Sequence, residues 1–161
     1  MFVAEETLNR VLVDEEATVA FGRNLHGAIK QHCGDRAVIY LHGDLGAGKT
    51  TLVRGVLREM NHMGAVKSPT YTLLEPYETR AGNIFHFDLY RLTSPEELEF
   101  LGFDEIFSGP GFKFVEWPEQ GAGWLPPANV EVALSLYSPT SDDQLLNTVS
   151  AMQRQVQVRF A

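Results

Sequence analysis

The sequence has little cysteine and comparatively little basic charge, and it lacks long apolar runs. Cys33 is the only cysteine among 161 residues, which excludes an intrachain disulfide and a zinc site built from cysteines. Thirteen lysines and arginines face 21 aspartates and glutamates, so the formal net charge is −8. A chain this acidic is a poor candidate for wrapping a nucleic-acid backbone, which requires a basic surface. Any phosphate that the protein binds should therefore be bound locally.

The sequence shows no sign of export or membrane insertion. Residues 1–10 carry two glutamates and lack the basic and apolar segments of a secretory signal. No apolar run approaches the roughly 18 residues needed to span a bilayer. We therefore expect a cytoplasmic protein without membrane association. Its 44% hydrophobic and 21% charged residues are ordinary for a globular protein, and the length favours one domain over residues 1–161.

Hydrophobic patterns in the first half of the chain predict two strand–helix units. Residues 11–13 form a short apolar strand, and Asp14 is suited to cap a helix whose apolar stripe continues to Ile29. Residues 37–41 form a continuous apolar run, as expected of a strand that is buried on both faces of a parallel sheet. A glycine-rich loop follows, and 49–60 has the pattern of the next helix.

The middle of the chain predicts further strands, two of which lead into carboxylates. Residues 71–74 have the pattern of a strand that stops before Pro76. Residues 83–88 form another strand with an aspartate as the last residue, and 112–115 form a third that is followed by Glu116.

A helix start and two alternating segments complete the pattern. Residues 94–97 read Ser-Pro-Glu-Glu, which combines a capping box with proline at the first helical position. Residues 130–137 and 155–160 alternate apolar and polar side chains around a turn-rich segment at 138–143. We therefore expect an α/β fold in which helices flank a mostly parallel sheet, with antiparallel strands at the C-terminal edge.

A phosphate-binding motif lies between the predicted strand and helix. Residues 43–50 read Gly-Asp-Leu-Gly-Ala-Gly-Lys-Thr and match the P-loop pattern G-x-x-x-x-G-K-[ST], which makes the fold P-loop NTPase-like. The glycines let the backbone curl, so that amide N–H groups surround a phosphate at the N-terminus of the next helix. Lys49 can reach the β- and γ-phosphate oxygens, and the Thr50 hydroxyl can ligate Mg²⁺. The nucleotide-binding residues predicted here are Gly43, Gly46, Ala47, Gly48, Lys49, Thr50 and Thr51.

Two carboxylates are expected beside the phosphates. Mg²⁺ prefers oxygen ligands, and ligands of open parallel sheets bind beyond the carboxyl ends of the strands. Asp88 and Glu116 both stand at such strand ends, so we predict that both act at the metal and, together with Lys49, in catalysis. One carboxylate can hold Mg²⁺ while the other orients the attacking water. The sequence leaves open which of them contacts the metal.

Three other side chains have a functional and a structural interpretation. Thr70 follows a Ser-Pro pair after the P-loop helix, so it belongs either to a nucleotide-sensing loop or to a simple strand-entry turn. Trp117 either stacks on a ring or partner, or packs in the core. His86 alternates with two phenylalanines on a strand, which favours a packed, hydrogen-bonded histidine over a catalytic one.

Several sequence blocks occur together with the P-loop. They are Lys-Ser-Pro-Thr-Tyr-Thr-Leu at 67–73, His-Phe-Asp-Leu-Tyr-Arg-Leu at 86–92, Pro-Glu-Glu-Leu-Glu at 95–99 and Val-Glu-Trp-Pro at 115–118. In order and spacing they resemble the TsaE (YjeE) family of small bacterial P-loop ATPases, over about residues 10–137. That family is required for threonylcarbamoyladenosine modification of tRNA. The resemblance implies ATP binding with slow hydrolysis, and association with TsaB and TsaD, the partner proteins that carry out the threonylcarbamoyl transfer.

The resemblance also implies roles for individual residues at the site. Thr50 and Glu116 would be the Mg²⁺ residues, and Asp88 would be the Walker-B-type carboxylate. Thr70 would belong to the sensing loop, and Trp117 would support the neighbouring glutamate.

The start of the first helix resembles the family's region near the adenine and ribose. On this basis Glu15 and Thr18 are further nucleotide-binding residues. A protein of this acidity should reach tRNA only indirectly, through its partners, because charge repulsion opposes direct contact.

Two other function classes share the P-loop. A small-molecule or nucleoside kinase usually brings several arginines over the phosphates, and residues 61–153 contain only Arg80 and Arg91. A nucleotide-dependent binding switch without turnover would commonly select guanine with an Asn/Thr-Lys-x-Asp segment, and no lysine here precedes such an aspartate. We therefore expect an ATPase whose hydrolysis drives or resets a multiprotein complex. The segment after Tyr137 matches no motif.

Overall fold

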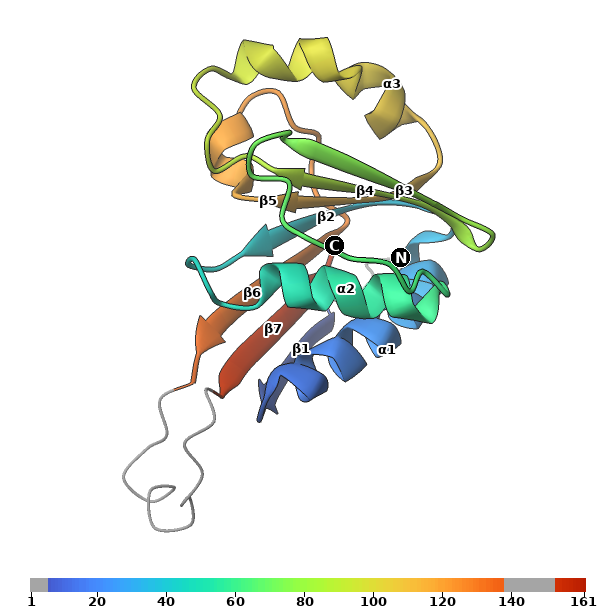
Figure 1. Cartoon of the computed structure of the whole chain (residues 1–161), viewed down its shortest axis with the longest axis vertical. Helices are drawn as coiled ribbons and strands as arrows, with labels where there is room; N and C mark the ends of the chain where they lie inside the picture. The colour runs from blue at the N-terminus through green and yellow to red at the C-terminus, as the bar shows by residue number, and fades with distance from the viewer. Residues whose placement is uncertain (1–5, 138–152) are drawn as a thin grey trace.

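A single sheet organises the computed structural model, which describes residues 6–137 and 153–161 (Figure 1). The seven strands hydrogen-bond in the order β1-β7-β6-β2-β5-β4-β3. Strand β2 pairs in parallel with β5 and β6, and β4 pairs in parallel with β5. Antiparallel pairs join β1 to β7, β7 to β6 and β3 to β4. The strands are β1 (Glu6–Leu12), β2 (Arg36–His42), β3 (Leu74–Thr79), β4 (Gly82–Asp88), β5 (Gly111–Glu116), β6 (Val130–Leu136) and β7 (Arg154–Phe160).

Helices cover both faces of this sheet and bury two apolar clusters. The larger cluster joins the two long helices to one face, and the smaller cluster lies on the other face under the short helices. Figure 1 shows α1 and α2 on one side of the sheet and α3 on the other. The fold class expected from the sequence is therefore confirmed. The helical elements are α1 (Glu15–Cys33), α2 (Lys49–Glu59), η1 (Pro95–Leu101), α3 (Phe103–Ser108) and η2 (Pro118–Gly121).

Helices α1 and α2 pack against each other through two glycines. A Cβ on Gly22 would lie 2.3 Å from Leu52 O, and a Cβ on Gly55 would lie 2.2 Å from Val19 O. Both positions therefore exclude any larger residue while the backbones stay this close. Asp14 caps α1 as predicted, because its carboxylate accepts a 2.7 Å hydrogen bond from Ala17 N. This packing fixes α2, and with it the P-loop, against the sheet.

The strand predicted at residues 71–74 is displaced in the structure. Residues 71–73 form a turn, and β3 instead runs from Leu74 to Thr79 with Pro76 inside it. Proline is tolerated because β3 is an edge strand with β4 as its one neighbour, so the missing N–H removes no bond that the sheet requires. Strand β1 likewise extends further than predicted, starting at Glu6 rather than at residue 11.

The capping box predicted at residues 94–97 does not form. The Ser94 hydroxyl donates to the Glu96 side chain, and the Thr93 hydroxyl donates to Glu97. The segment that follows is a 3₁₀ helix rather than an α-helix, and Gly102, with φ 69, caps its C-terminal end. The predicted turn at 138–143 lies outside the described residues. Among the residues described, no helix combines the length and the apolar character that crossing a membrane would require.

Candidate functional site

The P-loop and both predicted carboxylates lie at the same end of the sheet, here called the P-loop end. The loop follows β2, and Asp88 and Glu116 are the last residues of β4 and β5. These two residues are direct partners in the parallel register of their strands, and Glu116 is also the partner of Leu41 on β2. Parallel strands therefore bring the three segments together, as predicted from the strand ends.

Two glycines of the loop hold positions that a side chain would disrupt. Gly43 has φ 149, and a Cβ there would lie 2.5 Å from Leu134 O on β6. Gly48 has φ 107 and starts α2 in a left-handed conformation, which favours glycine over residues with a side chain. The loop therefore turns sharply from β2 into α2, and the first amides of α2 face the P-loop end of the sheet.

A cavity of about 300 Å³ opens between the loop and the two strand ends. It contains most of the predicted nucleotide and metal residues, but Gly43, Glu15, Thr18 and Trp117 do not line it. Four lining residues were not among the predicted site residues: Leu45, Ser68, Tyr90 and Arg154. The predicted site residues that do line the cavity are Gly46, Ala47, Gly48, Lys49, Thr50, Thr51, Thr70, Asp88 and Glu116.

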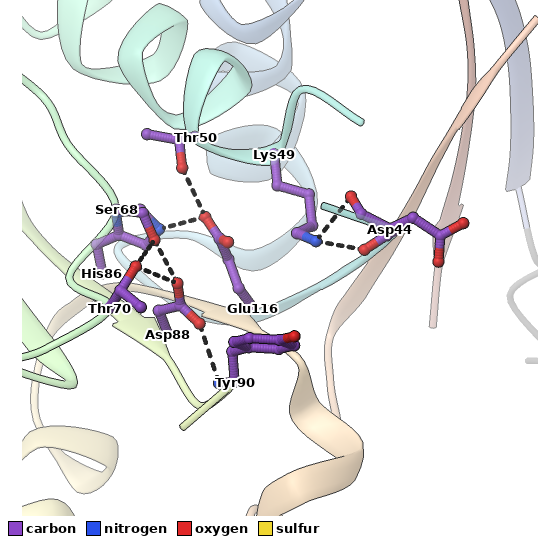
Figure 2. A network of polar contacts seen from close by, with 10 residues as sticks. Asp44, Lys49, Thr50, Ser68, Thr70, His86, Asp88, Tyr90 and Glu116 are labelled. Atoms are coloured by element: carbon purple, nitrogen blue, oxygen red, sulfur yellow. Dashed lines mark hydrogen bonds and ion pairs between the residues drawn. The ribbon is translucent and has the colours of Figure 1, made fainter. Parts of the chain in front are cut away.

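Glu116 accepts two hydrogen bonds through one carboxylate oxygen. The Thr50 hydroxyl donates to Oε1 at 3.0 Å, and His86 Nε2 lies 2.8 Å from the same oxygen (Figure 2). His86 is fully buried, and its Nδ1 has no hydrogen-bond partner in the described part of the chain. The histidine is therefore packed and hydrogen-bonded, as the sequence predicted. It holds the glutamate beside the threonine of the P-loop.

Asp88 is held by the loop that precedes β3. The Ser68 hydroxyl donates to Oδ2, and the Thr70 hydroxyl lies 3.4 Å from the same oxygen (Figure 2). The other oxygen, Oδ1, accepts a 3.0 Å hydrogen bond from Tyr90 N. Leu73, with φ 63, closes this loop and accepts a backbone hydrogen bond from Asp88 N at 3.0 Å. The hydrogen bonds to Asp88 therefore fix the position of the Ser-Pro-Thr loop beside the cavity.

Lys49 lines the cavity, and its ammonium group is hydrogen-bonded to the loop. Its Nζ donates to Gly43 O and to Asp44 O, the latter at 3.3 Å (Figure 2). Nζ also lies 4.3 Å from the centroid of the Trp117 ring. Burial lowers the pKa of Lys49, while the carboxylates of Glu116 and Asp88 act in the opposite direction.

Trp117 adopts a backbone conformation that is unusual for a residue with a large side chain. Its φ of 56 places it in the left-handed region, directly after Glu116. The Trp117 ring packs against the Tyr90 ring with centroids 5.0 Å apart. It also contacts the ammonium group of Lys49. Strained conformations of this kind collect at functional sites, where the surrounding structure enforces them.

Glu15 and Thr18 lie at the start of α1, away from the cavity lining. Glu15 is exposed and forms a 2.9 Å ion pair with Arg54 of α2. Thr18 is fully buried, and its hydroxyl donates to Asp14 O at 3.2 Å. In this structure the two side chains therefore stabilise the start of α1 and its contact with α2.

The oxygen atoms at the cavity fit a magnesium ion that is shared with phosphate. Thr50, Asp88 and Glu116 supply one hydroxyl and two carboxylates, which are ligands that Mg²⁺ prefers. Within the described residues there is no group of three or more His, Cys, Asp and Glu side chains that could hold a metal ion unaided. Mg²⁺ would therefore need phosphate oxygens or water to complete its coordination.

A second cavity lies at the opposite end of the sheet and has a different character. It measures about 410 Å³, and its wall includes Lys30 and Asp35, which form a 3.7 Å ion pair. It has neither a glycine loop nor carboxylates at strand ends. The chemistry of phosphate binding therefore points to the smaller cavity.

The sheet and its flanking helices define an α/β protein whose loop after β2 matches the P-loop pattern in sequence. Residues 12–144 match the family described as threonylcarbamoyl adenosine biosynthesis protein TsaE. The tRNA threonylcarbamoyladenosine biosynthesis protein TsaE of Haemophilus influenzae is 44% identical over 142 residues, covering 88% of this chain and 90% of the relative. A protein of the same name from Rickettsia bellii is 36% identical over 138 residues, covering 85% and 91%. This chain belongs to the TsaE family.

A solved structure supports the same fold. The crystal structure of YdiB from Bacillus subtilis superimposes with a TM-score of 0.73 at 24% sequence identity, covering 99% of this chain and 88% of that one. The family model and the sequence relatives confirm the predicted family. The solved structure confirms the predicted α/β architecture.

Proposed function

We propose that this protein is an ATPase that binds Mg-ATP at the P-loop end of the sheet. Slow hydrolysis would drive or reset a multiprotein complex that makes the threonylcarbamoyladenosine modification of tRNA. One observation carries this proposal: a P-loop, its Lys49 and Thr50, and the paired carboxylates Asp88 and Glu116 line one cavity. The names of the relatives support the tRNA-modification role.

We propose different tasks for the two carboxylates, and their hydrogen bonds support this division. Glu116 accepts a hydrogen bond from Thr50, which supports a role for this pair in holding Mg²⁺. Bound there, the ion would neutralise charge on the phosphates. Asp88 is hydrogen-bonded to the Ser-Pro-Thr loop, which supports a role in orienting water and in sensing the terminal phosphate through Thr70.

The reaction is a displacement at the γ-phosphorus of ATP. The water oxygen forms the new bond to phosphorus, and the bond to the β–γ bridging oxygen breaks, which releases ADP and inorganic phosphate. The proton of the water leaves through Asp88 to solvent. Lys49 exchanges its carbonyl acceptors for phosphate oxygens when the nucleotide binds, which uses an ammonium group that is already desolvated.

Loss of the γ-phosphate gives the protein a way to signal to other proteins. The loop around Thr70 would be ordered by the triphosphate and released after hydrolysis, which changes its affinity for partners. We propose TsaB and TsaD as these partners and the cytoplasm as the compartment. The net charge of −8 supports indirect rather than direct contact with tRNA.

Nucleotide binding and turnover of Glu116→Ala test the proposal. Calorimetry with ATP, ADP and GTP, with and without Mg²⁺, should show Mg²⁺-dependent binding that favours ATP over GTP in the wild type. In Glu116→Ala, ATP turnover with partners present should fall at least tenfold, and by more than ATP affinity falls, because Lys49 and the loop amides remain. Glu78→Ala, on an exposed position of β3, is the matched control.

Three results would contradict the proposal. They are a wild type that binds no nucleotide, a Glu116→Ala variant with unchanged turnover, and transfer of the γ-phosphate to a nucleoside instead of water. A pull-down with and without ATP, probed for TsaB and TsaD, tests the partner assignment separately.

A further inference from the structure

His86 is a polar side chain at a core position of β4. Side chains alternate between the two faces of a sheet, so His86 lies on the same face as Ile84 and Asp88. Ile84 and Phe114, the register partner of His86 on β5, both belong to the larger apolar cluster. An apolar side chain would continue this pattern, and a buried imidazole is unfavourable unless hydrogen bonds compensate it. Packing alone therefore does not account for a histidine at this position.

The imidazole makes one hydrogen bond within the described part of the chain. His86 is fully buried, its Nδ1 has no hydrogen-bond partner there, and its Nε2 lies 2.8 Å from Glu116 Oε1. A carboxylate oxygen accepts, so Nε2 carries the hydrogen and donates it. The same Oε1 accepts the 3.0 Å hydrogen bond from the Thr50 hydroxyl (Figure 2). Two donors on different elements, β4 and α2, therefore hold one oxygen of the glutamate.

The second oxygen of Glu116 is left for another ligand. Oε2 accepts no hydrogen bond from the described residues, and Glu116 lines the cavity beside the P-loop. Glu116 is only 3% exposed, so water does not readily replace the two bonds that hold Oε1. A cation in this cavity therefore meets a carboxylate with one engaged oxygen and one free oxygen.

The number of free carboxylate oxygens matters because divalent cations differ in the coordination that they require. Mg²⁺ demands near-ideal octahedral geometry, which a carboxylate that chelates through both oxygens distorts. Ca²⁺ accepts a larger and more flexible set of oxygen ligands, and it commonly binds both oxygens of one carboxylate. A glutamate whose Oε1 is engaged by two donors therefore suits Mg²⁺ better than Ca²⁺.

We propose that His86 is a positioning residue that makes the site select Mg²⁺ over Ca²⁺, because it keeps Glu116 from offering both carboxylate oxygens. This inference rests on the proposed Mg-ATP function and adds the residue that determines which cation supports nucleotide binding. His86 does not line the cavity, so it acts through Glu116. Without the imidazole, Glu116 keeps only the bond from Thr50, and its carboxylate can turn to chelate the larger ion.

ATP binding by His86→Leu and His86→Gln tests this assignment, measured by calorimetry with Mg²⁺, with Ca²⁺ and with EDTA. The wild type should bind ATP more tightly with Mg²⁺ than with Ca²⁺. In His86→Leu the Mg²⁺-supported affinity should fall by about ten- to hundredfold, whereas the Ca²⁺-supported affinity should not fall. Glutamine retains a donor that reaches the position of Nε2, so His86→Gln should keep most of the preference for Mg²⁺. The affinity in EDTA should stay unchanged in both variants, because Lys49 and the loop amides remain.

His62→Leu is the matched control. The Nε2 of His62 is also buried without a hydrogen-bond partner in the described residues, but its ring packs on Tyr77 and does not line the cavity. This variant should leave all three affinities unchanged.

An unchanged ratio of Mg²⁺-supported to Ca²⁺-supported affinity in His86→Leu would overturn the inference. An equal loss with Mg²⁺, with Ca²⁺ and in EDTA would do the same, as would a His86→Gln variant with no more preference for Mg²⁺ than His86→Leu, or a wild type without that preference. If thermal unfolding shows that His86→Leu does not fold, His86→Asn takes its place, because its amide reaches only as far as the position of Nδ1. A wild type that binds no ATP under any of these conditions would instead overturn the proposed function itself.

Discussion

Lys49 and Lys113 are two buried lysines at opposite ends of the sheet, and they differ in what surrounds them. Lys49 is 5% exposed and Lys113 is fully buried. Burial lowers the pKa of both ammonium groups. Both donate to backbone carbonyls, and both lie over an aromatic ring: Trp117 at 4.3 Å and Phe85 at 6.0 Å.

The groups around each lysine indicate a structural role for Lys113 and support the proposed functional role of Lys49. Lys113 Nζ donates to the carbonyls of Gly109, Pro110 and Gly111, so its hydrogen bonds hold one turn before β5. Lys49 faces two carboxylates and an open cavity, and its carbonyl acceptors belong to the loop that would bind phosphate. Burial and a lowered pKa therefore do not distinguish the two lysines; the carboxylates and the glycine loop beside Lys49 do, and they support its proposed function.

The largest expected effect is the loss of nucleotide binding in Lys49→Met. Removal of the ammonium should weaken ATP binding by about a hundredfold or more, because charge-assisted bonds to phosphate are lost. The melting temperature without ligand should change little, since the freed carbonyls border a cavity. Calorimetry and thermal unfolding measure the two effects, with Lys113→Met as the matched variant. Normal ATP affinity in Lys49→Met would remove the distinction between the two lysines.

The local part of the site was predictable from the sequence, because it is encoded in contiguous residues. The P-loop pattern between a strand and a helix specified Lys49 and Thr50, and the carboxylates followed from the rule on strand ends. Arg154 could not be found this way. It lies 106 positions after Gly48, and only the pairing of β7 with β6 brings it to the loop.

The position of β3 and the burial of Lys113 depend on neighbouring strands and loops, which hydrophobic patterns in the sequence do not reveal. The position of β3 was missed because Pro76 normally ends a strand, and only its place at the edge of the sheet makes it acceptable. The burial of Lys113 was not predicted, because a lysine within the run 112–115 gives no indication of the carbonyls that satisfy it. One signal was available for Ser68: it stands two residues before Thr70, in the predicted sensing loop.

Lys113→Met should have a smaller effect than Lys49→Met, and the effect is on stability. The pH dependence of its free energy of unfolding tests the structural role of Lys113. Burial lowers the pKa of Lys113 to about 8, below its value in the unfolded chain. Between these values the unfolded chain binds more protons, so the lysine contributes more stability as pH rises. The stability of the wild type relative to Lys113→Met should therefore grow by about 2 to 3 kcal/mol from pH 8 to pH 10.

Urea unfolding of both proteins at several pH values measures this difference, and contributions from other titrating groups cancel in it. Near neutral pH the variant should already be less stable by about 1 to 3 kcal/mol, because three carbonyls lose their donor. Its ATP affinity should equal that of the wild type. A constant difference across the pH range would show that Lys113 keeps an ordinary pKa despite its burial.

The smallest effect is expected from the two aromatic rings beside the lysines. Trp117→Leu removes the ring 4.3 Å from Lys49 Nζ, and such contacts contribute about 0.5 to 2 kcal/mol. Because the ring holds the ammonium beside the loop, ATP affinity should fall by about three- to tenfold, with turnover at saturation retained. Phe85→Leu, beside Lys113, is the matched control and should leave ATP affinity unchanged. Equal ATP affinity in the two variants would show that the tryptophan only fills space beneath the lysine, and that the carboxylates and the loop alone distinguish Lys49 from Lys113.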